Sequence, residues 1–299
     1  MFKNGETLIN IGKELKLGRG RFAEWLRNRG HQTKEDFVAK YEKGKELYLS
    51  GISITKIVKE LNLSMKWFSI WLKDNDVEIR ENRTYSLNEN YFEVINTEEK
   101  AYWLGFLYAD GCVCRSGKIK HLEMTLKEED SRHIKKFLNA IESNAPIINK
   151  TIILNNKQYE ACKVSIGSAK MCRDLIKIGC TPRKSLTLTF PDESILRKDL
   201  ISHFIRGYVD GDGWIGISNN KKRQKARISI LGTYNFLLGI QEVMGWNKVS
   251  IRSNQRNKAY VIEYGSIATM DYLNQLYENA NIYLDRKYIK YKEIYAVLT

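Results

Sequence analysis

Two short segments constrain the fold of this chain most strongly, because they spell nearly the same pattern in distant parts of the sequence. Residues 103–111 read WLGFLYADG, and residues 205–213 read IRGYVDGDG. Each is an apolar run that ends in Asp-Gly. A repeated local pattern usually marks a repeated structural unit. The sequence therefore predicts two similar halves, each opened by a helix that carries this motif.

Small residues recur at the same spacing in both motifs. Gly105 and Ala109 are four residues apart in the first motif, and Gly207 and Gly211 are four apart in the second. Residues at this spacing lie on one face of a helix, and small side chains there let two helix backbones approach closely. We therefore expect the two motif helices to pack side by side, and in parallel if their ends are to match.

Parallel packing would bring Asp110 and Asp212 together at the C-terminal ends of the two helices. Two carboxylates at the negative ends of helix dipoles repel one another. A divalent cation would relieve the repulsion, because carboxylates, water and phosphate are the usual ligands of Mg²⁺. For one motif alone, the simpler interpretation is that Asp-Gly only ends a helix. Two copies, each with the small-residue face, favour the metal.

The segments after each motif follow the same order. Residues 121–126 (HLEMTL) and residues 225–230 (KARISI) alternate polar and apolar side chains, as half-buried antiparallel strands do. A helix, further strands and further helices follow in both halves. The fold class that we predict is α+β, duplicated within one chain, with a first half at 97–190 and a second half at 191–299.

A different repeat occupies the N-terminal region. Residues 9–30 align with residues 54–76, and each copy has the spacing of a short helix, a turn and a second helix. This is typical of helix-turn-helix units, whose second helix offers polar side chains to the major groove. We predict a helix-turn-helix-like unit at 1–33, a helix-turn-helix domain at 34–80 and a linker at 81–96. The alternative for both copies is a small helical bundle that packs against something else.

Polar residues off the apolar face of each second helix are the candidates for contact with DNA. These are Arg19 and Arg21 in the first copy and Lys66 and Ser69 in the second. Ser64 is a suitable N-cap for the second helix of the second copy.

The net charge of +14 indicates a polyanionic partner. Residues 215–258 contain nine lysines and arginines against one acid, and residues 150–184 contain eight against two. Both segments are strand-like rather than amphipathic helices, which favours nucleic acid over a membrane surface. A basic surface that only maintains solubility is the remaining alternative.

The other compositional features favour a cytoplasmic protein. We expect it to be encoded by a bacterium or a phage, with an organelle as the alternative. No apolar run is long enough to span a membrane, and the first residues lack the apolar core of a signal peptide. The five cysteines have no recognisable metal-site spacing, which favours reduced thiols. Cys112 and Cys114 alternate as they would along a strand, but the absence of a matching second pair weighs against a metal site there.

The two motifs resemble the signature helices of single-chain LAGLIDADG homing endonucleases, and the resemblance covers residues 97–299. It implies that Asp110 and Asp212 bind metal, helped by the backbone carbonyl groups of Ala109 and Gly211. The implied cofactor is Mg²⁺, as two or three ions shared between the motifs, with Mn²⁺ as a substitute.

The resemblance also assigns roles to other residues. Lys184 and Lys287, each in an Arg-Lys pair near the end of a half, are similar in placement to catalytic basic residues of the family. Asp210 stands at an earlier acid position, where the first motif has Tyr108, and we expect it to be structural.

The implied architecture is a pseudo-two-fold saddle of αββαββα units, whose sheets read double-stranded DNA at a long asymmetric site. The strand residues expected to contact DNA are Lys118, Lys120, Lys163, Arg223, Lys225, Arg227, Arg252, Arg256 and Lys258. The implied activity is metal-dependent hydrolysis of both DNA strands by a monomer. The alternatives are a DNA-binding regulator that has lost cleavage and an RNA maturase.

Overall fold

The computed structural model describes residues 34–50, 52, 54–77, 85–116, 119–154, 157–220, 223–246, 248–254 and 259–298. The chain divides into two compact units, residues 1–82 and residues 83–299. Among the helices in the described part of the chain, none is both long enough and apolar enough to cross a bilayer.

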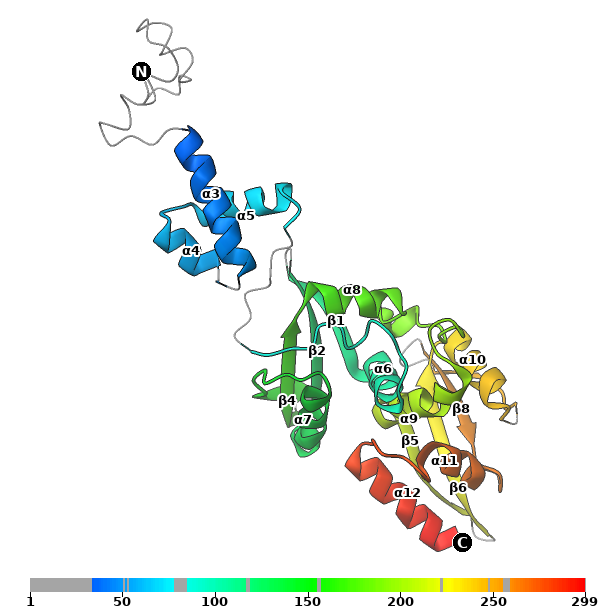
Figure 1. Ribbon diagram of the computed structural model, residues 1–299. Coiled ribbons are helices and arrows are strands. Elements are labelled where there is room, and N and C mark those ends of the chain that lie inside the picture. The colour runs from blue at the N-terminus through cyan, green and yellow to red at the C-terminus, as the bar shows by residue number, and fades with distance from the viewer. Residues whose placement is uncertain are drawn as a thin grey trace, which may run out of the picture. The chain divides into compact units, whose positions relative to one another are not determined.

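Three helices form the described part of the N-terminal unit (Figure 1). They are α3 (Lys34–Leu49), α4 (Ile54–Glu60) and α5 (Met65–Asp74). Their buried core consists of Tyr48, Ile57, Phe68 and Leu72. The helix, turn and helix expected at 54–76 are therefore present, whereas the first copy, at 9–30, lies outside the described residues. Ser64 is the N-cap residue of α5, although its hydroxyl makes no capping hydrogen bond.

The larger unit begins with a motif helix and a four-stranded antiparallel sheet. Its first half contains α6 (Glu98–Asp110), β1 (Gly111–Ser116), β2 (Ile119–Lys127), η2 (Glu128–Asp130), α7 (Ser131–Ala140), β3 (Ile148–Leu154), β4 (Lys157–Gly167), α8 (Ala169–Lys177) and η3 (Lys184–Leu186). Thr97 caps α6, since its hydroxyl accepts a hydrogen bond from the backbone N–H of Lys100 at 3.2 Å. The strand order is β1-β2-β4-β3.

The second half repeats this arrangement. It contains η4 (Lys198–Leu200), α9 (Ile201–Asp212), β5 (Gly213–Asn220), β6 (Arg223–Gly232), α10 (Tyr234–Met244), β7 (Arg252–Asn254), β8 (Ala259–Tyr264), α11 (Thr269–Tyr277) and α12 (Asp285–Leu298). The strand order is β5-β6-β8-β7. Gly111 pairs with Met124 in the first sheet, and Gly213 pairs with Ile230 in the second, so the registers match as well. The predicted duplicated α+β fold is confirmed.

Alternation along the strands places one face of each sheet in the core. In the first sheet Val113, Leu122 and Met124 are buried, while their neighbours along the strands point away from the core. In the second sheet Ile228 and Ile230 are buried in the same manner. Burying each such side chain contributes roughly 1.5–3 kcal/mol. One face of each sheet is therefore left for solvent or a partner.

The motif helices α6 and α9 lie side by side between the two sheets (Figure 1). A Cβ atom added to Gly105 would lie 1.9 Å from the carbonyl oxygen of Phe204, and one added to Gly207 would lie 2.0 Å from that of Tyr102. Farther along, a Cβ on Gly211 would lie 2.4 Å from the Cβ of Ala109. The contacts advance in the same direction along both helices, so the helices are parallel. They are also close, as the small residues predicted.

Residues 85–96 differ from the expected linker, because this segment packs on the larger unit. Phe92 is fully buried, and the Tyr85 hydroxyl accepts a hydrogen bond from the backbone N–H of Gly167 at 2.7 Å. Ser86 and Asn144 also form a hydrogen bond. The segment reads as polar in sequence, but its few apolar side chains fall where the core of the first half needs covering. Residues 78–84 lie outside the described part.

Candidate metal centre and nucleic-acid interface

Asp110 and Asp212 end the two motif helices and lie together, as their positions in the helices require. A Cβ atom on Gly211, the residue before Asp212, would lie 3.1 Å from Oδ2 of Asp110. Asp110 is half-buried and Asp212 is exposed. Both helices stop at the following glycine, where the backbone turns to an extended conformation and enters β1 or β5. The site therefore lies where two helices and two strands meet.

The protein environment disfavours ionisation of both carboxyl groups. Burial and the nearby Asp212 raise the pKa of Asp110 to about 7. Burial also raises the pKa of Asp212, even though one side of this residue is open to solvent. The positive charges of Lys184 and Lys287 oppose both shifts. Two carboxylates that lie close together repel one another when both are ionised, and a bound cation would relieve this repulsion.

The donor atoms at this site fit Mg²⁺. The two carboxylates are hard oxygen ligands, and the last backbone carbonyl groups of a helix have no partner within the helix. Ala109 and Gly211, at the penultimate positions of α6 and α9, offer such carbonyl groups. All these ligands are oxygen atoms, which is the set that a hard divalent cation prefers.

The two candidate lysines occupy matching positions beside this site. Lys184 Nζ donates a hydrogen bond to the carbonyl oxygen of Gly111. Lys287 Nζ donates to the carbonyl oxygen of Gly213 and, at 3.1 Å, to that of Val209. Both lysine side chains are buried. Each lysine therefore binds the glycine that follows one of the paired aspartates.

The local structure around the two lysines is different. Lys184 lies in the 3₁₀ turn η3, after Arg183 in a left-handed conformation, whereas Lys287 lies in the first turn of α12. Burial lowers the pKa of Lys287 to about 8, and the neighbouring aspartates act against that shift. A lysine with this pKa is a candidate for exchanging a proton near neutral pH.

Asp210 is fully buried and points away from the paired aspartates into a network of hydrogen bonds. Its carboxylate accepts from the hydroxyls of Tyr102 and Tyr277 and from the backbone N–H of Leu284, each at 2.7 Å. Burial raises the pKa of Asp210, and these three donors oppose the shift. The network connects α9 to α6, to α11 and to the segment before Lys287.

Arg206 makes a second buried connection. Its guanidinium pairs with Glu98 at 2.8 Å and donates to the carbonyl oxygens of Leu276 and Ile282 at 2.8 and 2.9 Å. Glu98 in turn accepts from the backbone N–H of Asn281. The start of α6, the middle of α9 and the loop that leads to α12 are thereby held in one cluster.

Three basic side chains on the outward faces of the sheets form ion pairs with glutamates. Lys163 Nζ lies 2.6 Å from Glu123 in the first sheet. In the second sheet Arg227 lies 2.9 Å from Glu263, which also pairs with Arg252. Partial burial acts to raise the pKa of Glu123, but the hydrogen bond from Lys163 and the charge of His121 hold it below its usual range. In the free protein, the acid partially neutralises each basic cluster.

The remaining DNA-contact candidates fall in different places. Lys66 is exposed on α5, Ser69 is half-buried there, and Lys225 is half-buried on β6. Lys120 and Arg223 lie at strand ends whose side chains are not described. Five candidates lie outside the described residues: Arg19, Arg21, Lys118, Arg256 and Lys258.

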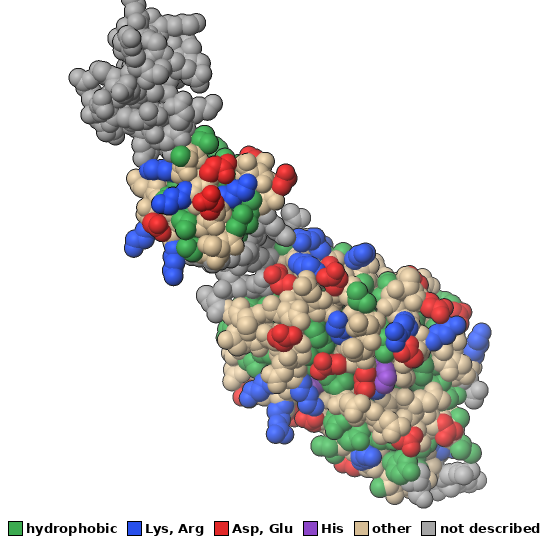
Figure 2. All heavy atoms as spheres, viewed as in Figure 1, with side chains coloured by type: hydrophobic (Ala, Val, Ile, Leu, Met, Phe, Trp, Pro, Cys, Tyr) green, Lys and Arg blue, Asp and Glu red, His purple; other side chains and the backbone are tan. Residues whose placement is uncertain are grey.

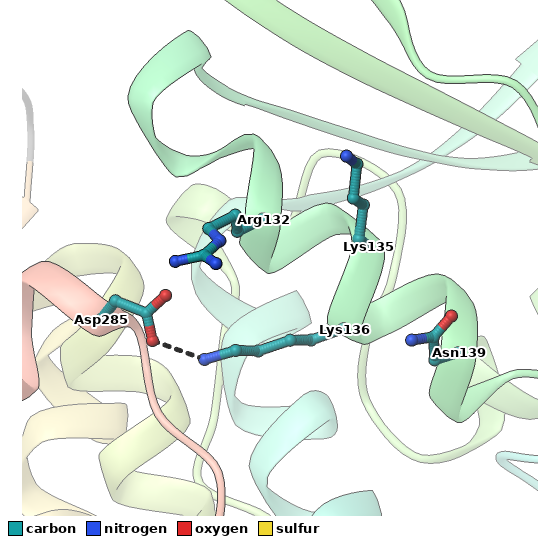
Figure 3. Close-up of a pocket in the computed structure, with 5 residues that line it drawn as sticks. All are labelled: Arg132, Lys135, Lys136, Asn139 and Asp285. Carbon is teal, nitrogen blue, oxygen red and sulfur yellow. Dashed lines mark hydrogen bonds and ion pairs between the residues drawn. The ribbon is translucent and has the colours of Figure 1, made fainter.

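A pocket of about 390 Å³ lies elsewhere, between α7 and the start of α12 (Figure 3). Its lining residues are Arg132, Lys135, Lys136, Asn139 and Asp285. Figure 3 shows Lys136 reaching from α7 to Asp285 of α12, at 2.7 Å. This contact joins the two halves and involves neither paired aspartate.

On the face shown in Figure 2, basic side chains of the larger unit are interspersed with acidic ones rather than gathered in a patch.

The glutamates of the sheet faces and the buried ion pair between the motif helices were not identified from the sequence. Glu123 and Glu263 alternate with the apolar strand residues, so their outward position was available from the sequence. Their partners were not, because Lys163 and Arg252 come from other strands and pairing depends on register. The Arg206–Glu98 ion pair joins two helices through a buried contact that no local pattern indicates.

Residues 205–298 match the family model described as LAGLIDADG endonuclease. The match confirms, over this part of the chain, the resemblance noted in the sequence. The first half lies outside this match, but it has the same strand order as the second half and an equivalent motif helix. No curated protein sequence matches this chain.

The chain is also similar to solved structures, at low identity. The homing endonuclease I-WcaI bound to its DNA recognition sequence has 11% identity and a TM-score of 0.48, covering 72% of this chain and 97% of that one. The LAGLIDADG homing endonuclease I-LtrWI bound to target DNA has 10% identity and a TM-score of 0.46, covering 71% and 90%. The mesophilic variants of I-DmoI have 14% identity and a TM-score of 0.43, covering 69% and 99%.

Proposed function

We propose that this protein is a site-specific homing endonuclease that hydrolyses both strands of double-stranded DNA with the help of a divalent metal ion. The observation that carries the proposal is the pair of aspartates, Asp110 and Asp212, at the meeting ends of parallel motif helices. The family match of residues 205–298 supports it. One chain supplies both halves, so we propose a monomer, which needs no second copy to complete the site.

Asp110, Asp212 and the carbonyl groups of Ala109 and Gly211 are the proposed ligands of Mg²⁺, as two or three ions, with Mn²⁺ as a substitute. Bound ions of this kind activate water and stabilise both the attacking and the leaving oxygens of a phosphodiester. The two aspartates, one from each motif helix, would hold the ions. This pairing would give each half a role in cutting one strand.

Lys184 and Lys287 are the proposed catalytic basic residues. Both are buried beside the aspartates, and each fixes the carbonyl group of the glycine that follows one of them. Their positive charges would favour a phosphate at the site. With a pKa of about 8, Lys287 is also suited to exchange a proton with water at the reacting phosphate.

The outward faces of the two sheets are the proposed DNA-binding surface. Lys163, Arg227 and Arg252 would exchange their glutamate partners for phosphates or base edges when DNA binds. We propose the same role for the other strand candidates, Lys118, Lys120, Arg223, Lys225, Arg256 and Lys258. The basic segments of the sequence supply the long-range attraction for this step.

The N-terminal helices are proposed to extend the contact with DNA. In α5, Lys66 is exposed beside Trp67, whose side chain is 59% exposed. Lys66 and Ser69, with Arg19 and Arg21 of the first copy, would add affinity through linkage to the main binding surface. Removing residues 1–82 should weaken DNA binding and shorten the protected footprint. An unchanged footprint would show that these helices bind something else.

The decisive test uses the full chain and a target site selected from a random DNA library. The wild-type protein should cut the selected duplex in Mg²⁺ and fail to cut it in a chelator. Asp110→Asn and Asp212→Asn should each lower the cleavage rate by about 100-fold or more, because several kcal/mol of transition-state stabilisation come from the bound metal. Binding of the same duplex should persist in both variants, since an anion facing phosphate has been removed.

Two outcomes would overturn the proposal in favour of another function. Tight binding of a selected duplex with no cleavage in Mg²⁺ or Mn²⁺ would identify a DNA-binding regulator. Tight binding of folded RNA, with no preference for any duplex DNA, would identify a maturase.

A further inference from the structure

The outward face of the first sheet brings together four side chains that are typical transition-metal ligands. Cys112 and Cys114 come from β1, and His121 and Glu123 come from β2. Cys112 is paired with Glu123 and Cys114 with His121 in the antiparallel register. Because Val113 and Leu122 fill the core, all four ligand side chains point to the opposite face. In the sequence alone, only Cys112 and Cys114 are close together, and the pairing of the strands brings His121 and Glu123 beside them.

The ligand atoms are already close to one another. One sulfur, one ring nitrogen and one carboxylate oxygen, from Cys114, His121 and Glu123, all lie within 4.8 Å of each other. The His121 Nε2 atom is 3.1 Å from Oε1 of Glu123, and Cys114 Sγ is 3.9 Å from its Oε2. The Cys112 sulfur lies 2.9 Å from that of Cys114. Three ligand atoms are therefore close enough to share one ion, and the Cys112 sulfur, in contact with that of Cys114, is the candidate for a fourth ligand.

We propose that Cys112, Cys114, His121 and Glu123 form a binding site for a thiophilic divalent cation of the zinc class. Two thiolates, an imidazole and a carboxylate match the tetrahedral ligand sets of Zn²⁺, with bonds of about 2.0–2.3 Å. Thiolate and imidazole select zinc over Mg²⁺, which prefers oxygen ligands. This site is therefore chemically separate from the paired aspartates. An ion must displace protons from the thiols, as burial and the neighbouring Cys112 raise the pKa of Cys114 to about 11.

The second half of the molecule provides an internal comparison. Matching the strands by register, the equivalent positions in β5 and β6 are Trp214, Gly216, Arg227 and Ser229. None of these four residues has the thiolate, imidazole and carboxylate chemistry of the first set. The duplicated backbone therefore does not by itself produce the cluster. It is a property of the side chains that the first half alone carries.

Metal binding has a consequence for Lys163, which lies 2.6 Å from the same carboxylate oxygen of Glu123 that faces His121. A divalent ion on Glu123 would repel this ammonium group and displace it toward solvent. If the outward face binds DNA, which rests on the function proposed above, zinc would free Lys163 for phosphate. The metal site itself does not depend on that function.

The test is titration of the reduced, metal-free full-length protein with Co²⁺ as a spectroscopic substitute for zinc. We expect one ion per chain, a sulfur-to-cobalt charge-transfer band and the strong visible bands of tetrahedral cobalt, all removed by Zn²⁺ and unaffected by excess Mg²⁺. Cys114→Ser and His121→Ala should weaken zinc binding by about 100-fold or more, since even outer-shell partners of metal ligands contribute about 10–100-fold. Ser229→Ala, at the position equivalent to Glu123, should leave the spectrum unchanged.

Several results would overturn the proposal. Absence of the charge-transfer band would exclude the thiols as ligands, and an identical band in Cys114→Ser would exclude Cys114 and with it the proposed site. A loss of two hydrogen atoms by mass spectrometry, with no metal uptake after reduction, would identify a Cys112–Cys114 disulfide instead. DNA binding by the zinc-loaded and zinc-free proteins is measured separately. Failure of DNA binding with a normal cobalt spectrum would contradict the proposed function and leave the metal site in place.

Discussion

The two halves of the larger unit share the same backbone arrangement, but different side chains anchor their motif helices. At position 108 of the first motif helix, the Tyr108 hydroxyl donates to the carbonyl oxygen of Ile178. At the equivalent position of the second, Asp210 accepts from the backbone N–H of Leu284. Both side chains fasten a motif helix to the segment that precedes a buried lysine. The same two segments are therefore joined in both halves. In the first half the side chain of the motif helix donates the hydrogen bond, and in the second half it accepts one.

The halves are most alike where backbone meets backbone and least alike on their outward faces. Gly105 and Gly207 make nearly identical close approaches to the opposite helix. By contrast, the outward face of the first sheet carries Cys114 and His121, and the equivalent positions in the second sheet are Gly216 and Arg227. Contacts that need a particular backbone separation tolerate few side chains, whereas a surface that recognises an asymmetric partner must differ between halves.

The largest effect that we expect concerns the close approach of the motif helices. Gly207→Ala should lower the free energy of unfolding by about 3 kcal/mol or more, because the new Cβ would meet backbone rather than a movable side chain. Gly105→Ala should have a similar effect if the seam is symmetric. Urea unfolding of the full chain measures both.

Gly265→Ala is the matched control for these substitutions, since nothing lies within 4 Å of a Cβ at that position. Its effect should stay within about 1 kcal/mol. A Gly207 variant as stable as the control would show that the helices can separate without cost.

The next effect compares the buried partners of the two motif helices. Asp210→Asn should cost about 1.5–3 kcal/mol, because three donors lose a charged acceptor. Tyr108→Phe removes one neutral hydrogen bond and should cost about 1 kcal/mol. Thermal unfolding of the two variants, side by side, gives the comparison.

Cleavage assays below the melting temperature separate structure from chemistry at these positions. Asp210→Asn should retain more activity than Asp212→Asn, since Asp210 points into the hydrogen-bond network. Equal loss of activity in both variants, with folding intact, would place Asp210 in the reaction.

A smaller, pH-dependent effect is expected at the paired aspartates in the metal-free protein. The pKa of Asp110 is raised from 3.8 to about 7. The folded protein therefore gains the full contribution of the protonated carboxyl group to its stability below pH 3.8, and it loses this contribution as the pH rises through 7. Asp110→Asn should therefore be more stable than wild type at about pH 8, by roughly 1–3 kcal/mol, with the difference shrinking at about pH 5. Urea unfolding in a chelator measures it.

Asp199 is the contrasting control for that experiment, because a hydrogen bond from Arg197 lowers its pKa. Asp199→Asn should give no gain in stability at high pH. A pH-independent difference between Asp110→Asn and wild type would contradict the raised pKa.

The smallest effect concerns the outward face of the second sheet. Arg227→Ala should weaken binding of a selected DNA duplex by about tenfold, as expected for a loss of about 1–3 kcal/mol at one contact. Glu263→Gln should strengthen binding, because it releases Arg227 and Arg252 from their ion pairs. Fluorescence anisotropy at fixed salt measures both. Opposite signs for the two variants are required if this face binds DNA.

Much of the fold was predictable because its signals are local and occur twice. The alternation in residues 121–126 and 225–230 identified β2 and β6, and Thr97 marked the start of α6. The spacing of Gly105 and Gly207 predicted a helix contact, since small residues on one helical face have few other uses. The prediction failed for residues 85–96, where a polar segment uses a few apolar side chains to cover the core.

The sequence by itself determined the duplication and the close contact of the motif helices, because these follow from periodicity and residue size. That Asp110 and Asp212 meet depended on the helices being parallel, and the structure decided this. Only the tertiary structure decided which side chains meet across strands and helices. The buried bonds of Asp210, the glutamates that hold Lys163 and Arg227, and the joining of Cys114 with His121 all depend on register and on packing between distant segments. Local sequence patterns carry the direction in which a side chain points, and the folded chain alone supplies its neighbour.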